Sequence, residues 1–167
     1  MVFSDQIRIR KVQETDLPAI TDIYNDAIRH TTATFDTEQK TLDNRKQWLE
    51  QHSQKYPVVV AALNEKVIGW ASLSKWSERA AYDDTAEISV YIHPDFRGKG
   101  IGRQLMQQVL HDGKKGGLHT VLSRITQDNE ISIHLHKEMG FKIVGTLKQV
   151  GKKFGQLLDV TMMQKMY

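Results

Sequence analysis

Cysteine is absent from the sequence, and its absence excludes several kinds of chemistry. The chain can form no disulfide bond, no thiolate metal site and no cysteine nucleophile, which mildly favours a reducing compartment. No apolar run approaches the roughly 18 residues that span a bilayer. Residues 1–11 include Asp5 and alternate Ile with Arg, whereas a secretion leader is basic and then apolar. We therefore expect a cytoplasmic protein without a membrane partner.

A strong excess of charge of one sign is also missing. Lys and Arg number 23 and Asp and Glu number 20, which gives a formal net charge of +3 at pH 7. The tightest basic clusters are the doublets Lys114-Lys115 and Lys152-Lys153. Such doublets are too small for the basic stripe that neutralises a run of phosphates. We expect no nucleic-acid partner, although a small phosphorylated ligand would suit this charge.

Proline is scarce as well, and nothing along the chain marks a linker. The 167 residues include three prolines, no low-complexity stretch and no repeat. This length is near the commonest size of one compact domain, and the 40% of hydrophobic residues is typical of a globular chain. We predict a single domain over residues 1–167.

The hydrophobic periodicity changes along the chain. Alternating or continuous apolar runs predict strands over residues 6–12, 58–63, 67–73, 85–93, 119–125, 141–144 and 157–163. Helical spacing predicts helices that begin at the N-cap candidates Thr15 and Thr41, a third that follows residues 97–102, and a fourth over 129–139. Hairpins first and strand–helix units afterwards imply an α/β chain with a mixed sheet and helices on both faces.

One turn carries a phosphate-binding pattern between a predicted strand and a helix. It consists of Arg97, Gly98, Lys99, Gly100, Ile101 and Gly102. Glycines at alternate positions allow a tight turn, and the bare amides at a helix N-terminus attract anions, so we expect a diphosphate here. The dinucleotide fingerprint would need a glycine at Arg103, and Gly113-Lys114-Lys115 lacks the Ser or Thr of a Walker loop. The alternative is a tight strand-to-helix connection without a ligand.

With this turn, the sequence resembles the GNAT superfamily of N-acetyltransferases, whose cofactor loop reads Arg/Gln-x-x-Gly-x-Gly/Ala. Further residues resemble the branch that acetylates phosphinothricin and methionine sulfoximine or sulfone. They are Tyr24-Asn25, Thr34-Phe35, Trp48, Tyr56-Pro57, Ala81-Tyr82, Glu87-Ile88-Ser89-Val90-Tyr91, Asn129, Ser132, Leu135-His136, Gly140-Phe141 and Lys153-Phe154-Gly155. One departure is Gly155-Gln156-Leu157-Leu158-Asp159, because relatives often have Trp before Leu-Asp.

The resemblance implies a fold, a cofactor and an assembly. The fold would be α/β (α+β), a mixed and mostly antiparallel sheet of six to seven strands whose central strands splay apart. Acetyl-CoA would place its pyrophosphate on residues 97–102 and its pantetheine arm along Val90, Tyr91 and Ile92, near Asn129 and Ser132. The chain would form a homodimer.

Transfer of an acetyl group to an amine requires proton transfer. An alkylammonium titrates near pH 10, so a base must remove its proton. Glu87 is the candidate, because it lies on the polar face of an otherwise apolar strand; the alternative is a solvated residue or a sheet-face salt bridge. The resemblance makes His136 a second candidate, protonating the departing thiolate, with packing near the cofactor as the alternative. His134 and His136 point to different sides of a helix, so we predict no metal site.

The predicted acceptor is a small compound that resembles an amino acid, and an arginine fork could hold its carboxylate. Arg79 is the first candidate, with a solvated loop arginine as the alternative. Candidate acceptor contacts also include Phe35, Trp76, Tyr82, Glu87 and Lys153. The alternative functions are acetylation of a polyamine, an aminoglycoside or a protein N-terminus, and a non-catalytic module that binds CoA and regulates a partner.

Overall fold

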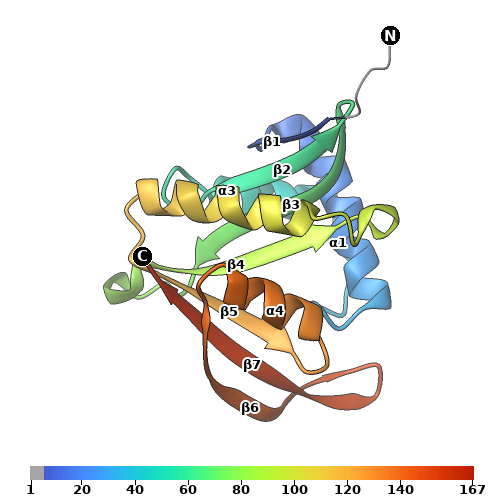
Figure 1. The fold of residues 1–167 in the computed structure, drawn as a ribbon. Helices are drawn as coiled ribbons and strands as arrows, with labels where there is room; N and C mark the ends of the chain where they lie inside the picture. The colour runs from blue at the N-terminus through green and yellow to red at the C-terminus, as the bar shows by residue number, and fades with distance from the viewer. Residues whose placement is uncertain (1–5) are drawn as a thin grey trace.

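The computed structural model describes residues 6–167, which form a seven-stranded sheet with helices on both faces (Figure 1). The remaining part of the predicted domain 1–167, residues 1–5, lies outside the described residues. The strands are β1 (Ile7–Lys11), β2 (Val58–Leu63), β3 (Lys66–Lys75), β4 (Thr85–Ile92), β5 (Thr120–Thr126), β6 (Lys142–Lys153) and β7 (Gln156–Met166). The helices are α1 (Leu17–His30), α2 (Leu42–Glu50), α3 (Ile101–Lys115) and α4 (Glu130–Glu138).

The sheet is mixed and mostly antiparallel, as predicted. Its strand order is β1-β2-β3-β4-β5-β7-β6, and only the neighbours β4 and β5 run parallel among the described strands. These two strands pair from Thr85↔Thr120 to Glu87↔Leu122 and then part, while β4 continues beside β3 as far as Ile92. The splay of the central strands is therefore confirmed, and Figure 1 shows β5 turning away from β4.

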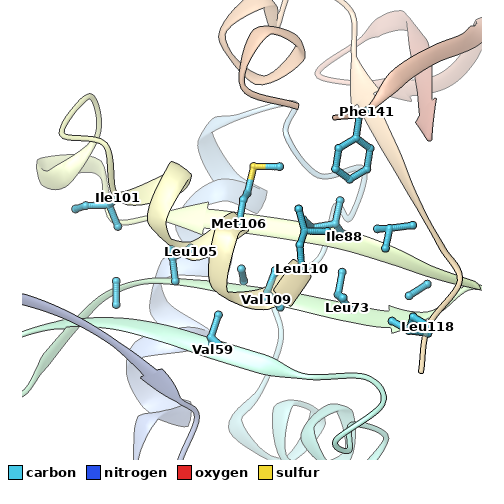
Figure 2. Packing of buried hydrophobic residues seen from close by; sticks show 14 of the residues in the cluster. Val59, Leu73, Ile88, Ile101, Leu105, Met106, Val109, Leu110, Leu118 and Phe141 are labelled. Carbon is cyan, nitrogen blue, oxygen red and sulfur yellow. The ribbon is translucent and has the colours of Figure 1, made fainter. Parts of the chain in front are cut away.

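Two apolar clusters fix the layers of the fold. On one face, Leu105, Met106 and Val109 of α3 pack on the sheet in a cluster that also takes in residues of α4 (Figure 2). On the other face, Ile20 of α1 packs in a second cluster with Trp70 of β3. The helices α1 and α3 each bury the apolar stripe that their 3.6-residue periodicity predicts.

The start of the first helix differs from the prediction. Thr41 caps α2 as expected, since its side chain accepts a hydrogen bond from the amide of Asn44 at 3.1 Å. The prediction of Thr15 as an N-cap was wrong, because residues 14–16 form a short 3-10 turn and Asp16 precedes α1. The buried Asp16 carboxylate instead accepts hydrogen bonds from the guanidinium of Arg10 at 2.8 and 2.9 Å.

The last two strands are longer than predicted. Residues 141–144 are only the beginning of β6, which has 12 residues, and β7 has 11. A turn at Phe154 and Gly155, both with positive φ, joins them into a hairpin. Most of β6 is exposed, so its sequence lacks the alternation of apolar and polar residues that reveals a half-buried strand.

Candidate active site

The parted ends of β4 and β5 border a cavity of about 500 Å³. Residues 87–91 of β4 form one wall and residues 123–126 of β5 form the other. The segment 33–36 after α1 closes one side, while Asn129, Ser132 and His136 close another. The cavity therefore exists because the two strands stop pairing after Glu87.

Glu87 lies at the last paired position of β4, on the edge of the cavity. Its carboxylate accepts hydrogen bonds from Nε and Nη2 of Arg124 at 2.6 and 2.5 Å. The guanidinium lies 5.4 Å from the centroid of the Trp76 ring. The side chain of Glu87 is 21% exposed and that of Arg124 is 55% exposed, and the hydrogen bond raises the pKa of Arg124. The sheet-face salt bridge is thus present, on a carboxylate that also borders the cavity.

His136 is buried and reaches the cavity beside a serine. Its Nδ1 lies 2.7 Å from the carbonyl oxygen of Ser132, so Nδ1 carries the proton and donates it there. Its Nε2 is then an acceptor for the Ser123 hydroxyl, which lies 3.0 Å away and lines the cavity. Burial lowers the pKa of His136, although the bond to Ser132 opposes the shift. The imidazole is therefore neutral at neutral pH.

The glycine turn leads into α3 with a row of amides that point to no partner. Gly98 and Gly100 adopt φ of +74° and +76°, a left-handed conformation that glycine adopts without steric cost. The first helical bond runs from the amide of Gln104 to the carbonyl of Gly100. Within the described residues 6–167, the amides of residues 98–103 have no hydrogen-bond acceptor. Gly102 lies inside α3 without a positive φ, so only two of the three glycines are required by backbone conformation.

Positive charge flanks this turn, as the sequence predicted. Arg97 donates from Nε to the carbonyl of Ile92 at 3.3 Å and lies 3.6 Å from the carboxylate of Asp26. The ammonium of Lys99 lies 5.2 Å from the ring of Phe96. The free amides, the helix N-terminus and these cations together suit a diphosphate.

The predicted cofactor contacts on β4 are only partly in the cavity. Val90 and Tyr91 line it, whereas Ile92 packs against the apolar cluster under α3. Asn129 caps α4 by accepting the amide of Ser132 at 3.2 Å, and both residues line the cavity.

The predicted acceptor contacts fall into two groups. Phe35 lines the cavity, and its ring lies over Gly151, where a Cβ would approach within 2.1 Å of it. Trp76 reaches the site through Arg124. Arg79 and Tyr82 are exposed and do not line the cavity. The structure therefore does not bring the predicted carboxylate-binding Arg79 to the site.

Lys153 forms a hydrogen bond with the segment 33–36. Its buried Nζ donates to the carbonyl of Thr34 at 2.7 Å, and burial lowers its pKa. Asp36 in the same segment accepts a hydrogen bond from the hydroxyl of Tyr24. Burial, followed by this bond, raises the pKa of Tyr24 to about 12.

Sequence reasoning missed Arg124 and Ser123. Both lie in the predicted strand 119–125, and Arg124 is the charged residue in β5. In a parallel pair, Leu122 shares a face with Glu87 and so does the residue two positions further. Arg124, two residues beyond Leu122, could therefore have been predicted to lie near Glu87. That prediction would have required knowing that β4 and β5 pair at these residues.

Among residues 6–167, no group of three or more His, Cys, Asp or Glu side chains could hold a metal ion. No helix in this range is long and apolar enough to cross a bilayer.

Comparison with known proteins gives a consistent result. Residues 18–141 match the acetyltransferase (GNAT) family. The chain is 42% identical over 158 residues to the L-methionine sulfoximine/L-methionine sulfone acetyltransferase of Pseudomonas paraeruginosa, covering 93% of this chain and 92% of the relative. It is 39% identical over 157 residues to the L-amino acid N-acyltransferase MnaT of Escherichia coli, covering 93% and 91%.

Solved structures agree with these sequence relatives. The acetyltransferase yncA of Salmonella typhimurium, solved with its cofactor acetyl-CoA, has a TM-score of 0.92 and 38% identity, covering 96% of this chain and 93% of that one. The ribosomal-protein-alanine N-acetyltransferase of Brucella melitensis has a TM-score of 0.92 and 40% identity, covering 96% and 99%.

Proposed function

The chain belongs to the GNAT family of acetyltransferases, and from this premise we propose that it uses acetyl-CoA to acetylate the amino group of a small amino-acid-like acceptor. Phosphinothricin, methionine sulfoximine and methionine sulfone are the acceptors that the names of its relatives suggest. In this proposal, residues 1–167 act as one catalytic domain.

The single observation that carries the proposal is the parting of β4 and β5, with the glycine turn following β4. The free amides of residues 98–103 and the cations Arg97 and Lys99 suit the diphosphate of acetyl-CoA. Beyond Glu87, no strand within residues 6–167 pairs with β4 on the β5 side, so its edge can pair with the pantetheine arm near Val90 and Tyr91. Asn129 and Ser132 lie across the same cavity.

When bound, acetyl-CoA supplies an acetyl group activated as a thioester. Glu87 attracts the acceptor ammonium and removes a proton from it, because only the neutral amine is nucleophilic. A carbon–nitrogen bond forms and the carbon–sulfur bond breaks. Of the two protons that the ammonium loses overall, one goes to solvent through Glu87 and one ends on the departing sulfur.

The Ser123 hydroxyl supplies the proton for the sulfur, and His136 holds that hydroxyl in place. The neutral imidazole does not itself carry an extra proton, but its Nε2 accepts from the Ser123 hydroxyl. When Ser123 gives its proton to the thiolate, its hydrogen bond to Nε2 of His136 is lost. A proton from the amine nitrogen then restores the Ser123 hydroxyl and this hydrogen bond. Ser123 is therefore the group in contact with the reacting atoms, and His136 positions it.

The second candidate function is acetylation of a protein N-terminus. The name of the Brucella melitensis structure favours it, since that protein is a ribosomal-protein-alanine N-acetyltransferase. A non-catalytic module that binds CoA is disfavoured because both Glu87 and the Ser123–His136 pair border the cavity.

The test is release of CoA thiol with a panel of amino acids, polyamines, aminoglycosides and peptides. We expect methionine sulfone or its relatives to lead the panel, and Glu87→Gln to lower turnover about 100-fold with little change in acetyl-CoA affinity. The matched control is Glu50→Gln, at the exposed end of α2. Peptides that outperform every free amino acid would favour the second candidate, and near-normal turnover of Glu87→Gln would contradict the role of this carboxylate.

A homodimer remains part of the proposal. Exposed apolar side chains gather on the β6–β7 hairpin, among them Ile143, Val144, Leu147, Val150 and Leu157. Burial of these side chains against a second copy would stabilise a dimer, and analytical ultracentrifugation tests it. The absence of a metal requirement and the cytoplasmic location stay predictions.

A further inference from the structure

We propose that Arg124 binds the carboxylate of the acceptor and that it releases Glu87 only when it does so. This inference rests on the proposed function and names the residue that selects the acceptor. It replaces Arg79, which does not line the cavity.

The distribution of charge in the cavity points to Arg124. It is the one lysine or arginine in the cavity lining drawn from residues 6–167, while the carboxylates there belong to Asp36 and Glu87. Asp36 already accepts from the hydroxyl of Tyr24 and lies 3.5 Å from the ammonium of Lys40. Among the described lining residues, an acceptor carboxylate therefore meets a cation only at Arg124.

The geometry of the ion pair suits an α-amino acid. Nε and Nη2 of Arg124 form the planar edge that binds carboxylates with two hydrogen bonds. In an α-amino acid, the carboxylate and the ammonium are on the same carbon atom. A carboxylate that takes this edge of Arg124 therefore places the ammonium beside Glu87, and each charge of the pair exchanges its partner for a charge of the acceptor.

The surroundings allow Arg124 to make this exchange. Its side chain is 55% exposed, so solvent rather than packed side chains surrounds much of it. The Trp76 ring 5.4 Å away attracts the guanidinium after Glu87 is released. Without an acceptor carboxylate, both oxygens of Glu87 stay hydrogen-bonded to Arg124, and the guanidinium stabilises the ionised carboxylate against taking a proton. A polyamine or aminoglycoside would also meet a guanidinium of like charge in the cavity. Arg124 thus favours amino acids over amines that lack a carboxylate.

The experiment compares two acceptors, methionine sulfone and its carboxamide, in which a neutral amide replaces the carboxylate. We expect Arg124→Gln to lower kcat/KM for methionine sulfone by about 10- to 100-fold, the effect of losing a charge-assisted pair of hydrogen bonds. For the carboxamide, the change should stay below about threefold or be a gain, because Glu87 is no longer paired. Arg124→Lys should recover part of the loss, since it keeps the charge without the fork.

Substitutions of two other arginines, Arg8 and Arg79, serve as comparisons for Arg124→Gln. Arg8→Gln, on the exposed edge strand β1, is the matched control and should change neither acceptor. Equal losses for both acceptors in Arg124→Gln would overturn the inference, as would an acceptor-selective loss in Arg79→Gln alone. A wild-type chain that acetylates neither acceptor would contradict the proposed function instead.

Calorimetry decides the role of Arg124 independently of turnover. Methionine sulfone is titrated into the wild-type chain and into Arg124→Gln, and its carboxamide into both. Weaker binding of methionine sulfone alone in Arg124→Gln supports the inference. Equal affinity of methionine sulfone for both chains overturns it, whereas no wild-type binding of either compound would contradict the proposed function.

Discussion

The hydroxyl of Ser123 lies 3.0 Å from Nε2 of His136, and this contact links a buried imidazole to the cavity. Ser123→Ala removes the hydroxyl that gives a proton to the departing sulfur, so we expect kcat to fall about 10-fold, less than for most general acids because water can substitute. It also leaves Nε2 buried without a donor, which should destabilise the fold by about 1–3 kcal/mol. Thiol release across a pH series and thermal melting measure the two effects.

Ser123→Thr is the matched variant, because it keeps a hydroxyl at the same position. We expect it to retain more turnover than Ser123→Ala. A melting temperature that falls while the pH profile and kcat stay unchanged would show that Ser123 has only a structural role.

Two histidines, His136 (buried) and His52 (half-buried), should make the fold sensitive to mild acid. Burial lowers the pKa of His136 and of His52 below the usual 6.5, whereas both titrate near 6.5 in the unfolded chain. Between pH 6.5 and the lower folded pKa, the unfolded state binds more protons than the folded state, so the free energy of unfolding decreases as pH falls. Above about pH 6.5, these two histidines do not change the free energy of unfolding. Each histidine contributes at most about 1.4 kcal/mol per pH unit.

Melting temperatures from pH 8 to pH 5 measure this effect. We expect little change from these groups above pH 7 and a decline below pH 6.5 that is shallower in His52→Gln. A melting temperature that rises as pH falls through 6.5 would contradict the burial of neutral imidazoles.

The left-handed backbone of Gly100 should matter for the cofactor. Gly100→Ala adds a side chain at φ of +76°, which costs about 1–2 kcal/mol, and the loop relieves this strain by moving the amides that follow it. We expect KM for acetyl-CoA to rise about 10-fold while KM for the acceptor is unchanged. Gly145→Ala is the matched control, since Gly145 lies in β6 with open space around it and no positive φ. Equal effects of the two substitutions would argue against the amide cradle.

Sequence reasoning succeeded where the signal is local. The glycine turn and the position of Glu87 on a polar strand face follow from residues close together in the chain. The structure places Glu87 on the edge of the cavity and leaves the amides of the turn without acceptors among the described residues. The partners of the site residues could not be predicted in this way. Arg124 and Glu87 are 37 positions apart and Lys153 and Thr34 are 119 apart, so these contacts depend on strand order and on where β4 and β5 part. Even the length of β6 required its partner β7, because its own residues are exposed.

Lys153 should influence the acceptor side of the cavity without touching the acceptor. Its buried ammonium holds the carbonyl of Thr34 at 2.7 Å, and Thr34 and Phe35 line the cavity. Lys153→Met keeps the apolar stem but removes the donor, so the segment 33–36 loses a charge-assisted hydrogen bond. We expect KM for the acceptor to rise about 10-fold, with kcat and KM for acetyl-CoA changed less than about threefold. Lys152→Met is the matched control, because the neighbouring lysine is exposed and its loss should leave both KM values unchanged. A fall in kcat with an unchanged acceptor KM would instead place the Lys153 ammonium close to the reacting atoms, where it would act on the chemistry rather than on the shape of the cavity.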